Sequence, residues 1–185
     1  LPQEVIQGAA KAVLELDNIG LSLIEISHRS SEFKAIMEEA CTLSLQLLGL
    51  EGKGYKAMFL QGGASMQFLM TAFNSLENKA GYVNSGTWST KAIKEAKILG
   101  EVIELAASRN QNFNYIPKGF EIPADLDYLH PTTNNTIFGT QYNTLPDTEV
   151  PLVADMSYDI FSRSFDYSKF DLFYAGAQKN MGPSG

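Results

Sequence analysis

Only one cysteine, Cys41, occurs in the 185-residue sequence, so the chain cannot form an internal disulfide. Cys41 falls on the apolar side of a predicted helix, and we interpret it as a small buried hydrophobic residue in a reducing compartment, the cytoplasm. Basic residues are also scarce: 14 Lys and Arg against 21 Asp and Glu leave a net charge of −7. Without a basic stripe to follow phosphates, the chain is not expected to bind nucleic acid. No apolar run approaches the roughly 20 residues that cross a bilayer, which argues against a membrane-spanning protein.

Segments typical of helices and of strands alternate along the chain. Apolar residues at helical spacing predict a first helix that begins at Leu1-Pro2, and later helices that end at Leu47, Leu76 and Leu99. Short apolar runs predict strands over residues 55–60, 82–83, 101–106, 128–130, 151–154 and 172–175. This alternation indicates an α/β fold in three layers, with a mainly parallel sheet flanked by helices on both faces.

No linker or internal repeat divides the chain. We interpret residues 1–20 as an N-terminal helix segment that packs on the main domain, and residues 21–185 as part of one large domain. The sequence opens on Leu1-Pro2 without a methionine and closes just past an apolar strand. We therefore expect it to be a truncated piece of a longer polypeptide.

Lys179 is the lysine that the sequence sets apart most clearly. It follows the predicted strand 172–175, and Gly182-Pro183 prevents a helix from carrying it to a solvated face. No carboxylate lies within four positions downstream of it. A desolvated lysine offers a free amine, which is the nucleophile of Schiff-base chemistry, and the alternative is an ordinary surface charge.

Asp155 and a glycine-rich turn are the next candidates. Asp155 ends the predicted strand 151–154, where its carboxylate needs a partner. That partner is either Ser157, in a simple cap, or a pyridinium nitrogen. The turn Gly62-Gly63-Ala64-Ser65 opens a helix whose N–H groups could cradle a phosphate, and the alternative is a tight turn without a ligand.

Two further side chains suit a planar cofactor. Trp88, the only tryptophan, stands at a helix start, where it could stack on a flat ring or simply pack in the core. Thr136 could offer its hydroxyl to a phenolate oxygen or form a turn hydrogen bond. A phosphate cradle, an indole, a strand-end aspartate and a strand-end lysine are together the parts of a pyridoxal-phosphate site.

Four blocks of the sequence carry a resemblance to a known family. They are Ser27-His28-Arg29, Gly62-Gly63-Ala64-Ser65-Met66-Gln67-Phe68, Ala154-Asp155 and Tyr174-Ala175-Gly176-Ala177-Gln178-Lys179-Asn180-Met181-Gly182-Pro183-Ser184-Gly185. With these blocks in this order, the chain resembles the phosphoserine aminotransferases over its whole length. These are fold-type-I pyridoxal-phosphate enzymes of class V. The block around Lys179 is the most specific of the four. The resemblance implies the large domain of such a transferase.

The resemblance also implies a role for each cofactor residue. Lys179 would form the Schiff base with pyridoxal phosphate and later carry a proton, and Asp155 would keep the pyridine nitrogen protonated. Trp88 would stack on the ring, and Thr136 would bond its phenolic oxygen. The residues that would hold the cofactor phosphate or its surroundings are Ala64, Ser65 and Gln178. Some relatives carry an arginine at the position of Ser65. No residues are assigned to a metal.

The implied reaction moves an amino group from L-glutamate to 3-phosphohydroxypyruvate. His28 and Arg29 would face the substrate carboxylate or phosphate across the interface of a homodimer, whereas Arg29 could instead pair with Glu25 or Glu32 on the surface. The family continues with a C-terminal half that this sequence lacks. Three alternatives remain at this stage: another class-V aminotransferase, a cysteine desulfurase, or a catalytically inert fragment. A desulfurase would need a catalytic cysteine, and Cys41 lies on a predicted helix face instead.

Overall fold

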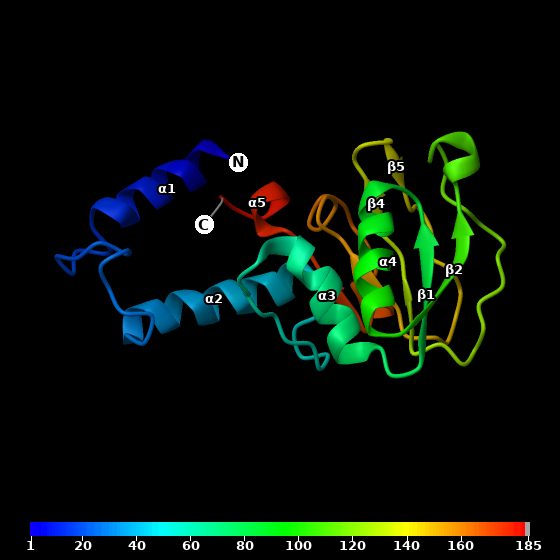
Figure 1. Ribbon diagram of the computed structural model, residues 1–185. Helices are drawn as coiled ribbons and strands as arrows, with labels where there is room; N and C mark the ends of the chain where they lie inside the picture. Colours follow the sequence, from blue (N-terminus) through cyan, green and yellow to red (C-terminus); the bar gives the residue numbers. More distant parts are fainter. Residues whose placement is uncertain (184–185) are drawn as a thin grey trace. The chain divides into compact units, whose positions relative to one another are not determined.

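The computed structural model describes residues 1–183 (Figure 1). Ser184 and Gly185, the end of the block around Lys179, lie outside the described residues. The described chain divides into two compact units, one formed by Leu1–Leu60 with residues 181–183, the other by Gln61–Asn180. The domain boundary expected at residue 20 stays a prediction.

The first unit contains two helices, α1 (Gln3–Leu14) and α2 (Ser31–Leu47). Ser30 caps α2, because its Oγ accepts a hydrogen bond from the N–H of Phe33 at 3.2 Å. No residue of either helix is buried. The predicted burial of Cys41 is therefore wrong: this α2 residue is half-buried and free, because two helices and their loops are too few to enclose the apolar faces.

The strand predicted over residues 55–60 is also wrong. These residues form no strand, and Met58, Phe59 and Leu60 are exposed. A strand needs a neighbouring strand to satisfy its N–H and C=O groups, and among residues 1–183 none pairs with this segment. A short apolar run alone does not reveal whether such a neighbour exists.

The second unit is built on short parallel strands. Those of the sheet are β1 (Lys79–Asn84), β2 (Glu101–Ala107), β3 (Tyr128–His130), β6 (Val153–Asp155) and β7 (Leu172–Tyr174). β1 pairs in parallel with both β2 and β3, and β6 pairs in parallel with β7. Parallel bridges from Leu129 to Leu152 and from Thr132 to Asp155 join the two groups into the order β2-β1-β3-β6-β7. The predicted parallel sheet is confirmed.

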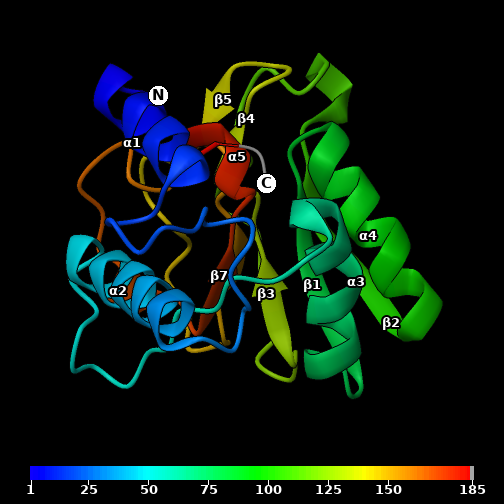
Figure 2. The same ribbon diagram turned by 90° about the vertical axis from the view of Figure 1, so that its left-hand side faces the viewer.

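The remaining elements of this unit are short, apart from two helices. They are α3 (Gly63–Ser75), α4 (Thr87–Leu99), η1 (Arg109–Gln111), β4 (Asn134–Asn135), β5 (Thr140–Gln141), η2 (Tyr167–Lys169) and α5 (Ala177–Asn180). β4 and β5 form an antiparallel pair. Figures 1 and 2 show α3 and α4 side by side along the sheet.

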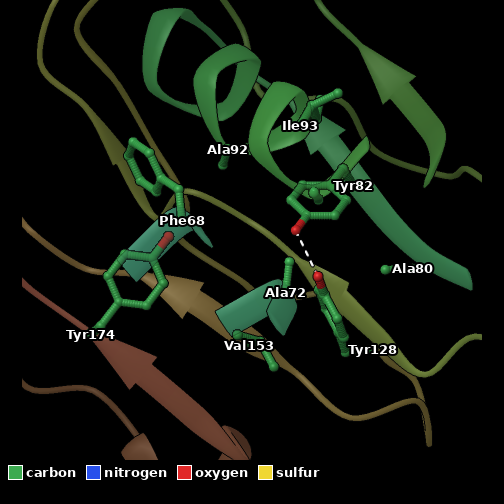
Figure 3. Packing of buried hydrophobic residues seen from close by; sticks show 10 residues of the cluster. Phe68, Ala72, Ala80, Tyr82, Ala92, Ile93, Tyr128, Val153 and Tyr174 are labelled. Carbon is green, nitrogen blue, oxygen red and sulfur yellow. Dashed lines mark hydrogen bonds between the residues drawn. The ribbon is translucent and has the colours of Figure 1, made fainter. Parts of the chain in front are cut away.

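The core of the second unit lies between these two helices and the sheet. Small side chains such as Ala72, Ala80 and Ala96 are fully buried there and allow the helices to approach the strands closely. Figure 3 shows Phe68 of α3 facing Tyr174 of β7, with ring centres 6.1 Å apart. This packing fixes the far end of the chain, including β7, to the first helix of the unit.

A line of buried aromatic and polar side chains crosses the middle of the sheet. The hydroxyls of Tyr82 and Tyr128 are 2.8 Å apart (Figure 3). The ring of His130 stacks on that of Tyr82 with centres 4.8 Å apart, and its Nε2 lies 2.9 Å from the hydroxyl of Tyr174. His130 Nδ1 is buried and has no hydrogen-bond partner among residues 1–183. Burial therefore lowers the pKa of His130 from 6.5 to about 4.

This depressed pKa predicts a loss of stability in mild acid. Between pH 6.5 and about 4 the unfolded chain binds a proton at residue 130 that the folded protein does not bind. The free energy of unfolding should therefore fall with decreasing pH by about 1.4 kcal/mol per unit, roughly 3 kcal/mol in all. Urea unfolding of the full-length protein at a series of pH values, compared with His130→Gln, measures this contribution as the difference between the two slopes.

The second histidine is the matched control. His28→Gln removes an exposed imidazole and controls for the loss of a histidine as such. Equal slopes for wild type and His130→Gln would show that His130 is protonated in the folded state.

Candidate active site

The candidate site lies where the parallel strands end. Because β1, β3, β6 and β7 run in the same direction, their carboxyl ends share one edge of the sheet. Trp88 follows β1, Thr136 follows β4, Asp155 ends β6 and Lys179 follows β7. All four predicted residues belong to the unit Gln61–Asn180.

Asp155 is a buried carboxylate, with 4% of its surface exposed. Its Oδ1 accepts two hydrogen bonds from Ser157, one from the backbone N–H at 3.0 Å and one from the hydroxyl at 2.6 Å. Burial raises the pKa of Asp155, and the hydrogen bonds from Ser157 and the charge of Lys179 act in the opposite direction. The cap on Ser157 that the sequence allowed is thus present, but within residues 1–183 it occupies one carboxylate oxygen only.

Lys179 is half-buried in α5 and lies against aromatic rings. Its Nζ is 3.5 Å from the centre of the Tyr158 ring and 5.5 Å from the centre of the Trp88 ring. Both distances fall within the range of a cation–π contact, of about 6 Å. The predicted lysine is therefore turned inward among site residues rather than toward open solvent.

Trp88 is held at the start of α4 by polar groups around the preceding turn. Asn84 Oδ1 accepts a hydrogen bond from Ser89 Oγ at 3.0 Å, which joins the end of β1 to the first turn of the helix. The Asn135 side chain passes so close to Gly86 that a Cβ there would collide with it. Trp88 itself is half-buried against the core, and its Nε1 is buried without a partner in the described chain.

Thr136 and Tyr158 meet beside the lysine. Hydrogen bonding with Thr136 and then with Lys179 lowers the pKa of the Tyr158 phenol. Thr136 is an exposed residue. The structure thus brings together Trp88, Thr136, Asp155 and Lys179 through their contacts with Tyr158 and with one another.

The sequence reasoning did not single out Tyr158. The available signal was its position, three residues after Asp155 in the turn that leaves β6, where an aromatic hydroxyl meets the same sheet edge as the other candidates. It was missed because a tyrosine in a polar turn is common, and its contact with Lys179 depends on the pairing of β6 with β7.

The predicted phosphate-binding residues lie at the start of α3 and on α5. Gly62 and Gly63 have φ angles of 98° and 60°, a left-handed conformation that glycine adopts without strain. No side chain caps the 13-residue helix that follows, so its N-terminal N–H groups remain for a ligand. Ala64 is half-buried, whereas Ser65 and Gln178 are exposed.

His28 and Arg29 lie in the first unit, in the turn before α2, and both are exposed. The N–H of Arg29 donates to Ser27 Oγ at 3.2 Å. The alternative pairing of Arg29 with Glu25 or Glu32 is absent, because the salt bridges within residues 1–183 are Lys79–Asp125, Arg109–Glu104 and Arg163–Asp159. The Arg29 guanidinium therefore forms no salt bridge within residues 1–183.

Two other features are absent from the described residues. No group of three or more His, Cys, Asp and Glu in residues 1–183 is arranged to hold a metal ion. None of the helices in those residues is long and apolar enough to cross a bilayer.

Comparisons with known proteins identify the family to which this parallel-sheet fold belongs. The chain belongs to the class-V aminotransferase family, whose model matches residues 1–185. It is 62% identical over 187 residues to phosphoserine aminotransferase of Flavobacterium johnsoniae, covering 100% of this chain and 52% of that protein. It is 55% identical over 185 residues to phosphoserine aminotransferase of Bacteroides fragilis, again covering 100% and 52%.

Solved structures agree with these sequence relationships. Phosphoserine aminotransferase from Bacillus circulans subsp. alkalophilus matches with a TM-score of 0.93 at 45% identity, over 100% of this chain and 52% of that one. The PLP-bound phosphoserine aminotransferase from Trichomonas vaginalis matches with a TM-score of 0.90 at 31% identity, over 100% and 53%. The predicted resemblance and fold class are confirmed. The chain spans about half the length of the curated relatives it matches.

Proposed function

We propose that this chain forms the cofactor-binding part of a phosphoserine aminotransferase, which transfers the amino group of L-glutamate to 3-phosphohydroxypyruvate and yields O-phospho-L-serine and 2-oxoglutarate. The observation that carries the proposal is the convergence of Lys179, Asp155, Trp88 and Thr136 at one sheet edge, in a chain 62% identical to an enzyme of that name. The complete enzyme would be a cytoplasmic homodimer with a C-terminal half beyond the matched region. Residues 1–20 would form a helical segment packed on the large domain.

The residues present fit pyridoxal phosphate. The uncapped start of α3 suits a phosphate, and the aromatic face of Trp88 suits a flat ring. Asp155 has one oxygen without a hydrogen bond within residues 1–183, as a partner for a protonated ring nitrogen requires. Lys179 supplies the amine that an aldehyde needs.

In the proposed reaction each of the four site residues has a separate role. Pyridoxal phosphate, when bound, supplies an aldehyde that reacts with amines and a ring that withdraws electrons from the bonds of the attached substrate. Asp155 holds a proton at the ring nitrogen, and its buried position keeps the charge–charge interaction strong. The Lys179 amine moves a proton at the substrate Cα, which is general base catalysis. Trp88 covers the ring face, and Thr136 donates to the phenolic oxygen.

His28 and Arg29 are proposed to bind the anionic groups of the substrates. A protein of net charge −7 must supply cations locally for two multiply anionic substrates. The planar fork of arginine matches a carboxylate or phosphate, and a charge-assisted hydrogen bond contributes about 1.5–3 kcal/mol. Arg29 has no acidic partner in the described chain that would compete.

A steady-state assay of the full-length protein tests the function and the role of Arg29 together. We expect formation of O-phospho-L-serine from L-glutamate and 3-phosphohydroxypyruvate. Arg29→Ala should lower kcat/KM for one or both substrates by roughly tenfold or more, with the cofactor absorbance unchanged. A wild-type protein that binds the cofactor but transfers no amino group would leave the inert alternative standing.

The control for this assay is Arg109→Ala. Arg109 is an exposed arginine already paired with Glu104 at 2.7 Å, so its loss should leave both substrates unaffected. Equal kinetics for Arg29→Ala and wild type would assign substrate recognition to other cations.

A further inference from the structure

Tyr158 combines an aromatic face and a hydroxyl at the centre of the candidate site. It lies in the turn after β6, three residues beyond Asp155. Lys179 Nζ is 3.5 Å from the centre of its ring, which is 2 Å closer than the 5.5 Å to the Trp88 ring. Of the aromatic rings in contact with this ammonium in residues 1–183, that of Tyr158 is therefore the nearest.

Thr136 and Lys179 both act on the hydroxyl of Tyr158. Thr136, and to a lesser extent Lys179, lowers the pKa of this phenol through hydrogen bonding. Partial burial and the charge of Asp155 act in the opposite direction. The charged groups that face the phenol are thus Lys179 and Asp155. A phenol that is more acidic than usual is also a stronger hydrogen-bond donor.

The backbone on both sides of Tyr158 is firmly anchored. Ser157 Oγ donates to Asp155 Oδ1 at 2.6 Å and accepts the N–H of Gly176 at 3.1 Å, which ties the turn to the segment leading to Lys179. On the other side, buried Asp159 accepts hydrogen bonds from Thr133 Oγ1 at 2.5 Å and from Arg163 at 3.2 Å. These anchors fix the backbone from which the Tyr158 side chain projects.

We propose that Tyr158 is a positioning residue of the cofactor site: its ring face orients the amine of Lys179, and its hydroxyl, together with that of Thr136, binds the phenolic oxygen of the cofactor ring. The second part rests on the proposed function, in which Thr136 bonds that oxygen. The hydroxyl of Tyr158, on which Thr136 acts, would then be available to the same oxygen.

Two substitutions separate the two roles of Tyr158. Tyr158→Phe removes the hydroxyl and keeps the ring, whereas Tyr158→Leu removes both. A hydrogen-bond donor to the phenolic oxygen makes this oxygen a weaker acceptor for the proton on the Lys179 nitrogen. Without the donor the oxygen is a stronger acceptor, so the proton on the nitrogen is lost at a higher pH. The pH midpoint of the visible absorption change of the loaded full-length enzyme should therefore rise in Tyr158→Phe, by roughly half a unit to one unit.

The ring is tested without relying on turnover. In the cofactor-free full-length protein, pyridoxal phosphate is added, the bond is trapped with borohydride, and label on the Lys179 peptide is followed by mass spectrometry over time. Tyr158→Phe should label at the wild-type rate, and Tyr158→Leu several-fold more slowly, because its amine is no longer oriented.

Matched variants complete the experiment. Thr136→Val should shift the midpoint in the same direction as Tyr158→Phe. Tyr115→Phe, which removes a hydroxyl bonded to Asn110 far along the chain, should shift nothing. If the wild type binds cofactor through Lys179 but the midpoint and labelling rate are unchanged in both Tyr158 variants, the positioning role is refuted and the proposed function stands. A wild type without label on Lys179 refutes the proposed function itself.

Discussion

Replacing Lys179 with alanine is expected to abolish visible absorbance of the bound cofactor and to lower turnover by roughly 10⁴-fold or more. In the proposed mechanism the variant loses both the covalent attachment point and the group that moves the substrate proton, and proton transfer alone contributes roughly 10²–10⁴-fold. Absorption spectra and single-turnover kinetics of the full-length protein measure the two losses. Borohydride reduction of the wild type should place the pyridoxyl mass on the peptide that contains Lys179.

Lys91 provides the control for this variant. It lies on α4 with its Nζ 4.5 Å from the centre of the Trp88 ring, closer to that ring than Lys179 is. Lys91→Ala should keep the colour and most of the activity. A pyridoxyl label on Lys91, or on any lysine other than Lys179, would contradict the assignment.

Replacing Asp155 with asparagine should leave the cofactor bound but slow the proton transfer by roughly 10²–10⁴-fold. The amide keeps the shape of the side chain and its hydrogen bonds with Ser157, but it carries no charge to hold a proton at the ring nitrogen. Single-turnover mixing with L-glutamate measures the step directly. A rate within a few-fold of wild type would remove Asp155 from the mechanism.

The same variant has an opposite effect on stability that serves as an internal check. Burial raises the pKa of Asp155, so the folded protein retains a proton that the unfolded chain has already lost. The stability of the cofactor-free protein therefore falls as the pH rises from the pKa of Asp155 in the unfolded chain to its higher pKa in the folded protein. Asp155→Asn should be more stable than wild type at neutral pH, and Asp159→Asn, which breaks the pair with Arg163, should be less stable.

The sequence predicted the elements of the second unit better than those of the first. The strands near residues 82, 101–106, 128–130 and 172–174 and the helices ending near Leu76 and Leu99 are present, because each apolar run meets a partner in one core. Residues 55–60 have the same apolar character but no adjacent strand among the described residues. An apolar composition indicates that a segment tends to be buried. A strand also requires a neighbouring strand for its backbone hydrogen bonds, and composition does not specify one.

The candidate site was predictable in its residue types but not in its contacts. Lys179 and Asp155 stand out because each follows an apolar strand, and parallel strands bring their carboxyl ends together. The contact of Lys179 with Tyr158 depends on the register in which Asp155 of β6 lies opposite Tyr174 of β7. That register is a property of the folded sheet. The phosphate-binding role of Ala64, Ser65 and Gln178 and the substrate role of His28 remain predictions.

The pairing of β6 with β7 also determines when the site can form during synthesis. Strands β1, β2 and β3 end by residue 130, and their mutual pairing requires nothing that follows. Asp155 meets Lys179 only after residues 172–174 have left the ribosome and paired with β6, and such non-local parallel pairing is intrinsically slow. In a nascent chain the proposed cofactor site would therefore be completed late, when β7 joins strands that are already paired.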